Sequence, residues 1–238
     1  PPRLPSRSEC LTTVGRQRIS WQKQPDRRLR LASTDALDGQ VGWEATFDRN
    51  AQLDLTQNRF AVVLEPQGSC RVIDLRSGHS LVDQEVQAQP ALEGVYLLMG
   101  TDSLVVAVQT QQGVDRTRMV TSFNRVDFPR NSDFAGQIYH FDRHTGQPIW
   151  EQPAEVAGLP LMLAQPVDLP IVAFAGNVRR RDQRGSRPEL GVLLLEKASG
   201  RLLYHQDDLP QSPRHFFLQV SDSQQTVLEM YARKLTLD

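Results

Sequence analysis

One turn sequence recurs four times in this chain of 238 residues and constrains its fold more than any other feature. Each copy has an acidic residue, a glycine four positions later, and a bulky apolar residue four positions after the glycine. The copies are Asp35, Gly39 and Trp43; Asp74, Gly78 and Val82; Asp142, Gly146 and Trp150; and Glu196, Gly200 and Tyr204. β-rich segments precede three of them, at 70–74, 137–142 and 191–196. Two strands joined by a short glycine-containing turn form a β-hairpin, so the sequence predicts repeated hairpins.

The chemistry of such a turn explains the spacing. A carboxylate at the start accepts hydrogen bonds from main-chain N–H groups two or three residues later. Glycine then adopts the positive φ that a short hairpin loop needs. We therefore interpret Asp35, Asp74, Asp142 and Glu196 as structural turn acids rather than catalytic groups. Trp43 and Trp150 occupy the same repeat position, which favours packing against a neighbouring sheet over stacking on a ligand.

Two more β-rich segments precede each of three hairpins, which predicts units of strands A, B and C, a turn and strand D. These segments are 51–55 and 59–65, 94–100 and 103–109, and 159–164 and 170–176. The full units are about 51–86, 94–153 and 159–206. Successive turn glycines are 39, 68 and 54 residues apart, and removing two polar insertions, 110–135 and 178–189, makes the intervals regular. Only 80–89 has any helical character. Repeated four-stranded units of about 40 residues predict an all-β fold, a β-propeller built of four-stranded antiparallel blades.

The ends of the chain leave two arrangements open. Residues 214–238 begin a further unit, which we expect to be completed by residues 28–46, so that the chain's own termini close a small four-bladed ring. Alternatively, the chain is part of a larger propeller whose remaining blades lie in the same longer chain, which the proline at position 1 slightly favours. One of the two must hold, because an open sheet edge promotes aggregation.

Charge and cysteines limit the remaining classes. Residues 1–30 carry a net charge of +6, although the whole chain has −1, and we expect a basic, irregular lead-in there. This lead-in is either solvated or in contact with an acidic partner. The overall charge argues against a histone-like nucleic-acid binder, and no apolar run is long enough to span a membrane. Cys10 and Cys70 stand far from any other cysteine, which argues against a zinc site and leaves open whether they form a disulfide or two free thiols.

GQIYHFDRHTGQPIWEQP at 136–153 resembles the repeat of the PQQ-like, or quinoprotein alcohol dehydrogenase-like, β-propeller family. Residues 70–85 and 191–206 are similar to degenerate copies, and the resemblance covers about 35–238. It implies the propeller fold, a periplasmic or extracellular bacterial protein, and either a cofactor-dependent dehydrogenase or a non-catalytic assembly scaffold. The quinone-binding members carry vicinal cysteines, whereas Cys10 and Cys70 are isolated. We therefore expect no cofactor.

Motifs of the common catalytic sites are absent from the sequence, including G-x-S-x-G, the P-loop and H-E-x-x-H. His140 and His144 flank a predicted hairpin turn, which favours structural or exposed histidines. Asp54, Asp102 and Asp168 are the candidate acids for a glycoside hydrolase on a propeller scaffold. We predict a non-catalytic module for protein–protein interaction, and an enzyme, either a quinone-dependent dehydrogenase or a glycoside hydrolase, is the alternative.

The two polar insertions carry the candidate binding residues. Both are predicted to join strands B and C, which places them on one face of adjacent blades. Together they hold nine arginines and five acidic residues. The arginines are Arg116, Arg118, Arg125, Arg130, Arg179, Arg180, Arg181, Arg184 and Arg187. Since a guanidinium group binds carboxylate or phosphate bidentately, we predict a protein partner with an acidic surface or an anionic polymer. The alternative is a pair of solvated loops.

Overall fold

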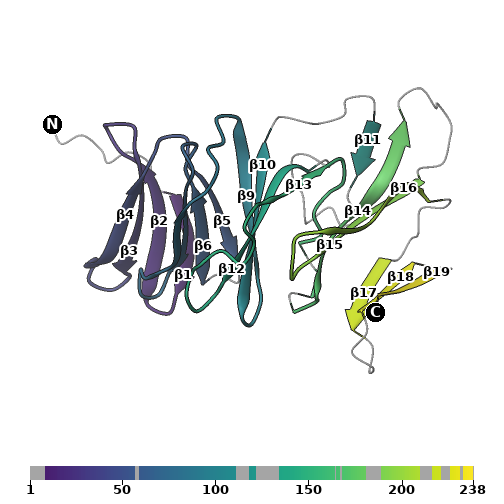
Figure 1. Ribbon diagram of the computed structural model, residues 1–238. Coiled ribbons are helices and arrows are strands. Elements are labelled where there is room, and N and C mark those ends of the chain that lie inside the picture. The colour runs from purple at the N-terminus through teal and green to yellow at the C-terminus, as the bar shows by residue number, and fades with distance from the viewer. Residues whose placement is uncertain are drawn as a thin grey trace. The chain divides into compact units, whose positions relative to one another are not determined.

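The structure is a computed structural model. It describes residues 9–56, 59–110, 118–121, 134–163, 165–166, 168–180, 189–209, 216–220, 226–230 and 233–237. These residues contain strands and no helix (Figure 1). The strands form four four-stranded sheets and one three-stranded sheet, and every strand pair whose register is resolved is antiparallel. The all-β prediction is therefore confirmed, and four-stranded antiparallel sheets in series are the blades of a β-propeller.

The first two sheets follow the chain in simple up-and-down order. The N-terminal sheet contains β1 (Glu9–Val14), β2 (Gln17–Lys23), β3 (Leu29–Asp35) and β4 (Val41–Phe47). The second contains β5 (Gln52–Thr56), β6 (Phe60–Leu64), β7 (Ser69–Asp74) and β8 (Ser80–Glu85). The second sheet spans residues 52–85, and residues 80–85 of the segment expected to have helical character form strand β8.

The next two sheets interrupt that order. The third has the order β13-β12-β10-β9, from β9 (Leu92–Met99), β10 (Ser103–Thr110), β12 (Ala135–Asp142) and β13 (Ala154–Ala157). The fourth has the order β11-β14-β15-β16, from β11 (Arg118–Thr121), β14 (Ile171–Arg180), β15 (Glu189–Glu196) and β16 (Leu202–Leu209). The last sheet has three strands, β17 (Phe216–Val220), β18 (Thr226–Met230) and β19 (Arg233–Leu237).

The structure differs from the sequence-based expectation at both ends. Residues 9–23, within the expected lead-in, form β1 and β2, and these strands complete a sheet with β3 and β4. Residues 28–46 therefore pair with 9–23, not with the C-terminal strands. The physical reason is that β2 presents Ile19 to the core and pairs with β3 over its whole length, from Gln17 opposite Asp35 to Lys23 opposite Leu29.

Two predicted strands also lie elsewhere. The segment 159–164 forms only an isolated bridge, Leu161 to Phe174, because Pro160 has no N–H to donate to a ladder. The outer strand of this sheet is instead β11, from within the first insertion. The fourth strand of the third sheet, β13, begins at Ala154, after the position of Trp150 at which strand D was expected.

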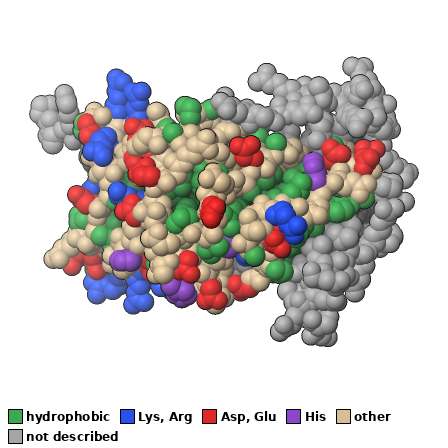
Figure 2. Space-filling view, viewed as in Figure 1, with side chains coloured by type: hydrophobic (Ala, Val, Ile, Leu, Met, Phe, Trp, Pro, Cys, Tyr) green, Lys and Arg blue, Asp and Glu red, His purple; other side chains and the backbone are tan. Residues whose placement is uncertain are grey.

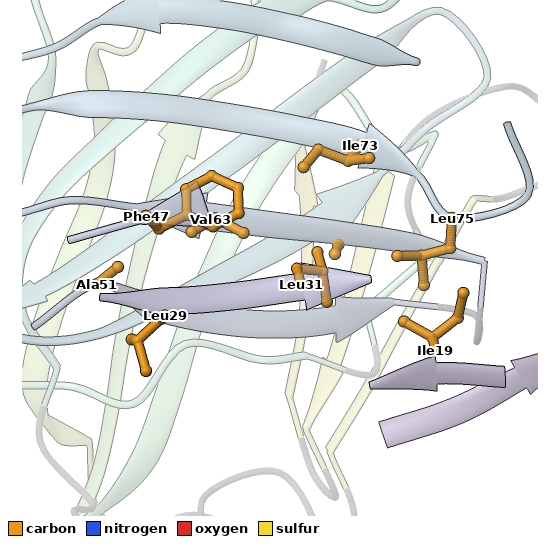
Figure 3. Close-up of a cluster of buried hydrophobic side chains, with 9 residues drawn as sticks. Ile19, Leu29, Leu31, Phe47, Ala51, Val63, Ile73 and Leu75 are labelled. Atoms are coloured by element: carbon orange, nitrogen blue, oxygen red, sulfur yellow. The ribbon is translucent and has the colours of Figure 1, made fainter. Parts of the chain in front are cut away.

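The chain divides into two compact units, 1–108 with 141–147 and 109–140 with 148–238. In the first unit, apolar side chains of the N-terminal sheet and the second sheet form one core, which contains Ile19, Leu31, Phe47, Val63 and Leu75 (Figure 3). In the second unit, β14 and β15 contribute most of a core that includes Ile171, Ala173, Val192 and Leu194. Burying each large aliphatic side chain stabilises the fold by about 1.5–3 kcal/mol.

Candidate functional site

The predicted binding arginines fall in two groups. Arg118 lies in β11, and Arg179 and Arg180 are the last residues of β14. The others lie outside the described residues: Arg116, Arg125, Arg130, Arg181, Arg184 and Arg187. The structure therefore locates the bases of the two insertions.

Those bases are joined by strand pairing. β11 runs antiparallel to β14, with Arg118 opposite Arg180, Met119 opposite Arg179, and Val120 opposite Val178. Val178 is also opposite Glu189 in the β14–β15 pair. The second insertion, 178–189, therefore begins beside β11, the strand that lies within the first insertion. Sequence reasoning missed β11, although its apolar and β-branched residues, RMVT, were a weak strand signal within a polar loop.

The turn acids are engaged by their own loops. Asp142 Oδ1 accepts hydrogen bonds from the main-chain N–H groups of His144 and Thr145, at 2.9 and 2.7 Å, and from the Thr145 hydroxyl at 2.9 Å. The N–H of Thr145, followed by its hydroxyl, holds the pKa of Asp142 below its usual value. In the same way the N–H of Leu37 is the main cause of a lowered pKa at Asp35. A carboxylate held ionised in this manner is a poor proton donor for catalysis.

The other turn residues repeat this geometry. Asp74 Oδ1 accepts from the N–H of Arg76 at 2.8 Å, and Glu196 accepts from the Ser199 hydroxyl. The four turn glycines all have positive φ: Gly39 at 73°, Gly78 at 75°, Gly146 at 69° and Gly200 at 75°. This backbone conformation favours glycine at all four positions.

The two repeat tryptophans contact the turn of the next hairpin motif within their own unit. Trp43 Nε1 donates to the carbonyl oxygen of Leu75 at 3.0 Å, and Trp150 Nε1 donates to that of Lys197 at 2.9 Å. The acceptor in each case directly follows the turn acid. A Cβ added at Gly78 would lie 2.5 Å from Trp43 Cγ, so glycine is needed for the approach of the indole as well as for φ. Both tryptophans are therefore committed to packing between sheets.

His140 is the one buried histidine in the described part of the chain. It is 5% exposed, its ring meets that of Trp150 edge-on at a centroid distance of 5.3 Å, and neither ring nitrogen makes a hydrogen bond there. Burial, with a smaller repulsion from Lys197, lowers the pKa of His140 to about 4. The imidazole is thus neutral at pH 7. His144 is exposed, and its Nε2 lies 3.3 Å from Asp102 Oδ1, so the two histidines do not form a ligand pair.

The three candidate hydrolase acids have separate surroundings. Asp54 is half-buried and its Oδ2 accepts from the N–H of Leu97 at 3.3 Å, which links β5 to β9; burial raises the pKa of this carboxyl. Asp102 is exposed beside His144. Asp168 is exposed and acts electrostatically on Lys197 in the second unit. Each of the three carboxyls therefore interacts with a different local group: the N–H of Leu97, the ring of His144 and the charge of Lys197.

Other chemistry can be stated briefly. Among the described residues, no group of three or more His, Cys, Asp or Glu side chains is placed to hold a metal ion. Cys10 and Cys70 are free thiols, the first exposed and the second buried, and burial raises the pKa of Cys70 to about 12. No helix in the described part of the chain has the length and hydropathy needed to cross a membrane.

Comparison with known proteins gives structural similarity alone. No family model and no curated protein matches the sequence. Among solved structures, the computationally designed Ika4 protein is 15% identical, with 78% of this chain and 88% of that chain covered and a TM-score of 0.35. BamB from Moraxella catarrhalis is 13% identical, with 94% and 67% covered and a TM-score of 0.28. Dihydro-heme d1 dehydrogenase NirN in complex with DHE is 14% identical, with 95% and 42% covered and a TM-score of 0.41. At this level the blade assignment rests on the strand order and register of the chain itself.

Proposed function

We propose that this chain is a non-catalytic binding and scaffold module of the PQQ-like propeller type, and that its arginine-rich insertions engage a protein partner with an acidic surface or an anionic polymer. The observation that carries the proposal is the pairing of β11 with β14, since it anchors both insertions at one sheet edge. A rigid sheet that presents variable loops is a common arrangement for binding.

The register places Arg118 and Arg180 at directly opposite positions of the β11–β14 pair. Arginine is suited to anion binding because its planar group donates two parallel hydrogen bonds to carboxylate or phosphate. The binding free energy would then depend strongly on salt concentration.

The cellular setting is part of the same proposal. The turn motif at 136–153 resembles the PQQ-like repeat, and this resemblance supports an extracytoplasmic bacterial protein in which the module is part of a larger assembly. The hydrogen bonds of the turn acids within their own loops support a structural role for these carboxylates, since a catalytic carboxyl must be free to exchange a proton.

The test is a charge-matched comparison on heparin and polyglutamate columns eluted with salt. The variant Arg179→Ala, Arg180→Ala and Arg181→Ala should elute at lower salt than the wild type. The control Arg18→Ala, Arg76→Ala and Arg201→Ala removes the same charge from other turns and strands and should elute later than the insertion variant. Equal elution of the two variants would refute a role for the insertions.

A second measurement separates scaffold from enzyme. The wild-type protein is titrated with pyrroloquinoline quinone and calcium, and reduction of a dye is followed with alcohol substrates. We expect no turnover. Sustained dye reduction would replace the scaffold by a quinone-dependent dehydrogenase.

A further inference from the structure

Three exposed arginines gather at one end of the N-terminal sheet, far in sequence from the insertions. Arg27 and Arg28 lie in the β2–β3 connection, and Arg49 lies in the β4–β5 connection. The register shows that both connections leave the same end of the sheet, since Leu29 at the start of β3 is opposite both Lys23 and Phe47. With neighbouring strands about 5 Å apart, the two loops begin within about 10 Å of each other. We call Arg27, Arg28 and Arg49 the loop-end cluster.

Within the described residues the arginines of the loop-end cluster have no ion pair, as is also true of Arg18 and Arg76, whereas other arginines of these two sheets do. Four arginines of the N-terminal and second sheets form ion pairs: Arg16 with Asp35 at 3.0 Å, Arg30 with Glu44, Arg59 with Asp74 at 3.0 Å, and Arg71 with Asp83 at 3.2 Å. None of Arg27, Arg28 and Arg49 has an ion pair or a side-chain hydrogen bond with another described residue. Figure 2 shows Lys and Arg side chains at the left of the view in two separate groups, one toward the top and one toward the bottom.

The acidic side chains at this end are occupied by main-chain groups. Asp26 Oδ1 accepts from the N–H of Arg28 at 3.0 Å, and Asp48 Oδ1 accepts from the N–H of Asn50 at 2.8 Å. Glu65 accepts from the N–H of Asp48. Each of these carboxylates accepts a main-chain hydrogen bond within a turn, and none of them is ion-paired with Arg27, Arg28 or Arg49.

Arg27 also has an unfavourable backbone. Its φ is 72°, and it is the only non-glycine residue with positive φ among those described. The turn is closed by hydrogen bonds from Gln24 N to Arg28 O at 2.7 Å and from Arg27 N to Gln24 O at 2.9 Å. Glycine adopts this conformation without steric cost, whereas an L-residue pays about 1–2 kcal/mol. Folding alone favours glycine here, so the arginine side chain has to be explained by something other than the turn.

We propose that the loop-end cluster is a docking site for a short acidic segment of a partner protein, recognised through its carboxylates. Three guanidinium groups on adjacent loops match two or three successive Asp or Glu side chains, each able to bind bidentately. Nucleic acid fits less well, because specific binders contact roughly 6–10 phosphates and the cluster offers three cations. This site is separate from the insertions, so the proposal can be tested independently of the function proposed above.

The test uses the full chain and a fluorescein-labelled hexaglutamate peptide, with binding measured by fluorescence anisotropy at low salt. Arg28→Glu with Arg49→Glu should weaken binding about ten-fold, as expected when two favourable surface contacts become repulsive. The control Arg18→Glu with Arg76→Glu makes the same charge change at exposed positions outside the cluster, and it should retain more affinity than the cluster variant. Equal losses in the two variants would overturn the proposal.

Two further arms locate the site. A hexaglutamate peptide with a photoreactive benzophenone should cross-link to residues 24–28 and 48–50 in a protein that also carries Arg179→Ala, Arg180→Ala and Arg181→Ala. Cross-links confined to other segments would overturn the docking site whatever the outcome for the insertions. Arg27→Gly should raise the melting temperature by roughly 2–4 °C while it lowers affinity for the peptide. Unchanged affinity in this variant would remove Arg27 from the site, and with it the argument from its backbone.

Discussion

The buried imidazole of His140 makes the stability of the second unit depend on acidity. Burial lowers the pKa of His140 from 6.5 to about 4. In the unfolded chain the same group titrates near its ordinary value. Between these two pH values the unfolded state binds more protons than the folded state, so the free energy of unfolding decreases as the pH falls through this window. Above pH 6.5 both states are neutral and this contribution is constant.

The magnitude follows from the size of the shift. One pKa unit corresponds to about 1.4 kcal/mol, so the full cost of protonating His140 in the folded unit is about 3 kcal/mol, reached below pH 4. The positive charge of Lys197 acts in the same direction, since it repels the protonated ring. His140→Phe removes the titrating group and keeps a ring against Trp150. Since both imidazole nitrogens are buried without hydrogen bonds among the described residues, the variant should fold at pH 7 at least as well as the wild type.

The assay is urea unfolding followed by tryptophan fluorescence at pH 7, 6, 5 and 4. Other groups titrate in this range, so the informative quantity is the difference between the wild type and His140→Phe. The wild type should lose about 3 kcal/mol more than the variant between pH 7 and pH 4. The control His144→Gln, at an exposed position, should follow the wild type. Parallel pH profiles for the wild type and His140→Phe would refute the reasoning.

Two other predictions concern the first unit. Gly78→Ala should destabilise it by about 2–4 kcal/mol, because φ is unfavourable and the new Cβ meets Trp43. Gly39→Ala has nearly the same φ and no atom within 4 Å of its Cβ, so it should cost about 1 kcal/mol or less. Equal losses in urea unfolding would contradict the indole contact. A thiol reagent should label Cys10 rapidly in the native protein and Cys70 only after unfolding, because Cys70 is buried with a pKa of about 12; labelling of both at one rate, followed by absorbance, would contradict this.

The repeated turn made much of the fold predictable. Residues 59–65 were predicted as a strand and β6 spans Phe60–Leu64, because a continuous apolar run between turn signals has few other solutions. The packing of Trp43 and Trp150 against neighbouring sheets was also predicted from their shared repeat position and is confirmed. The sequence did not identify the acceptor carbonyls of Leu75 and Lys197, since any main-chain oxygen has the same chemistry.

The missed elements depend on long-range pairing. β11 is a four-residue strand whose partner residues in β14 are more than fifty positions away, so no local pattern reveals the pair. β1 and β2 were missed because basic side chains dominate the composition of residues 1–30, while the core contribution comes from few positions such as Ile19. The net charge of a segment reflects the side chains on its exposed face. It does not indicate whether the segment pairs as a strand. The positive φ of Arg27 likewise has no signal in its local sequence.

His140 and Arg27 each break a local rule of protein structure. Their different accessibility to a binding partner gives them different consequences. His140 places polar nitrogens in an apolar environment at 5% exposure, so a partner cannot reach it without opening the fold, and its effect is confined to stability. Arg27 holds an unfavourable backbone at an exposed loop, where its guanidinium is reachable and has no ion pair within the described chain. A residue that costs folding energy and whose side chain has no ion pair or hydrogen bond within the described chain is best explained by a contact outside it. For that reason the loop-end cluster, and not the buried histidine, is where we expect a binding partner of the first two sheets.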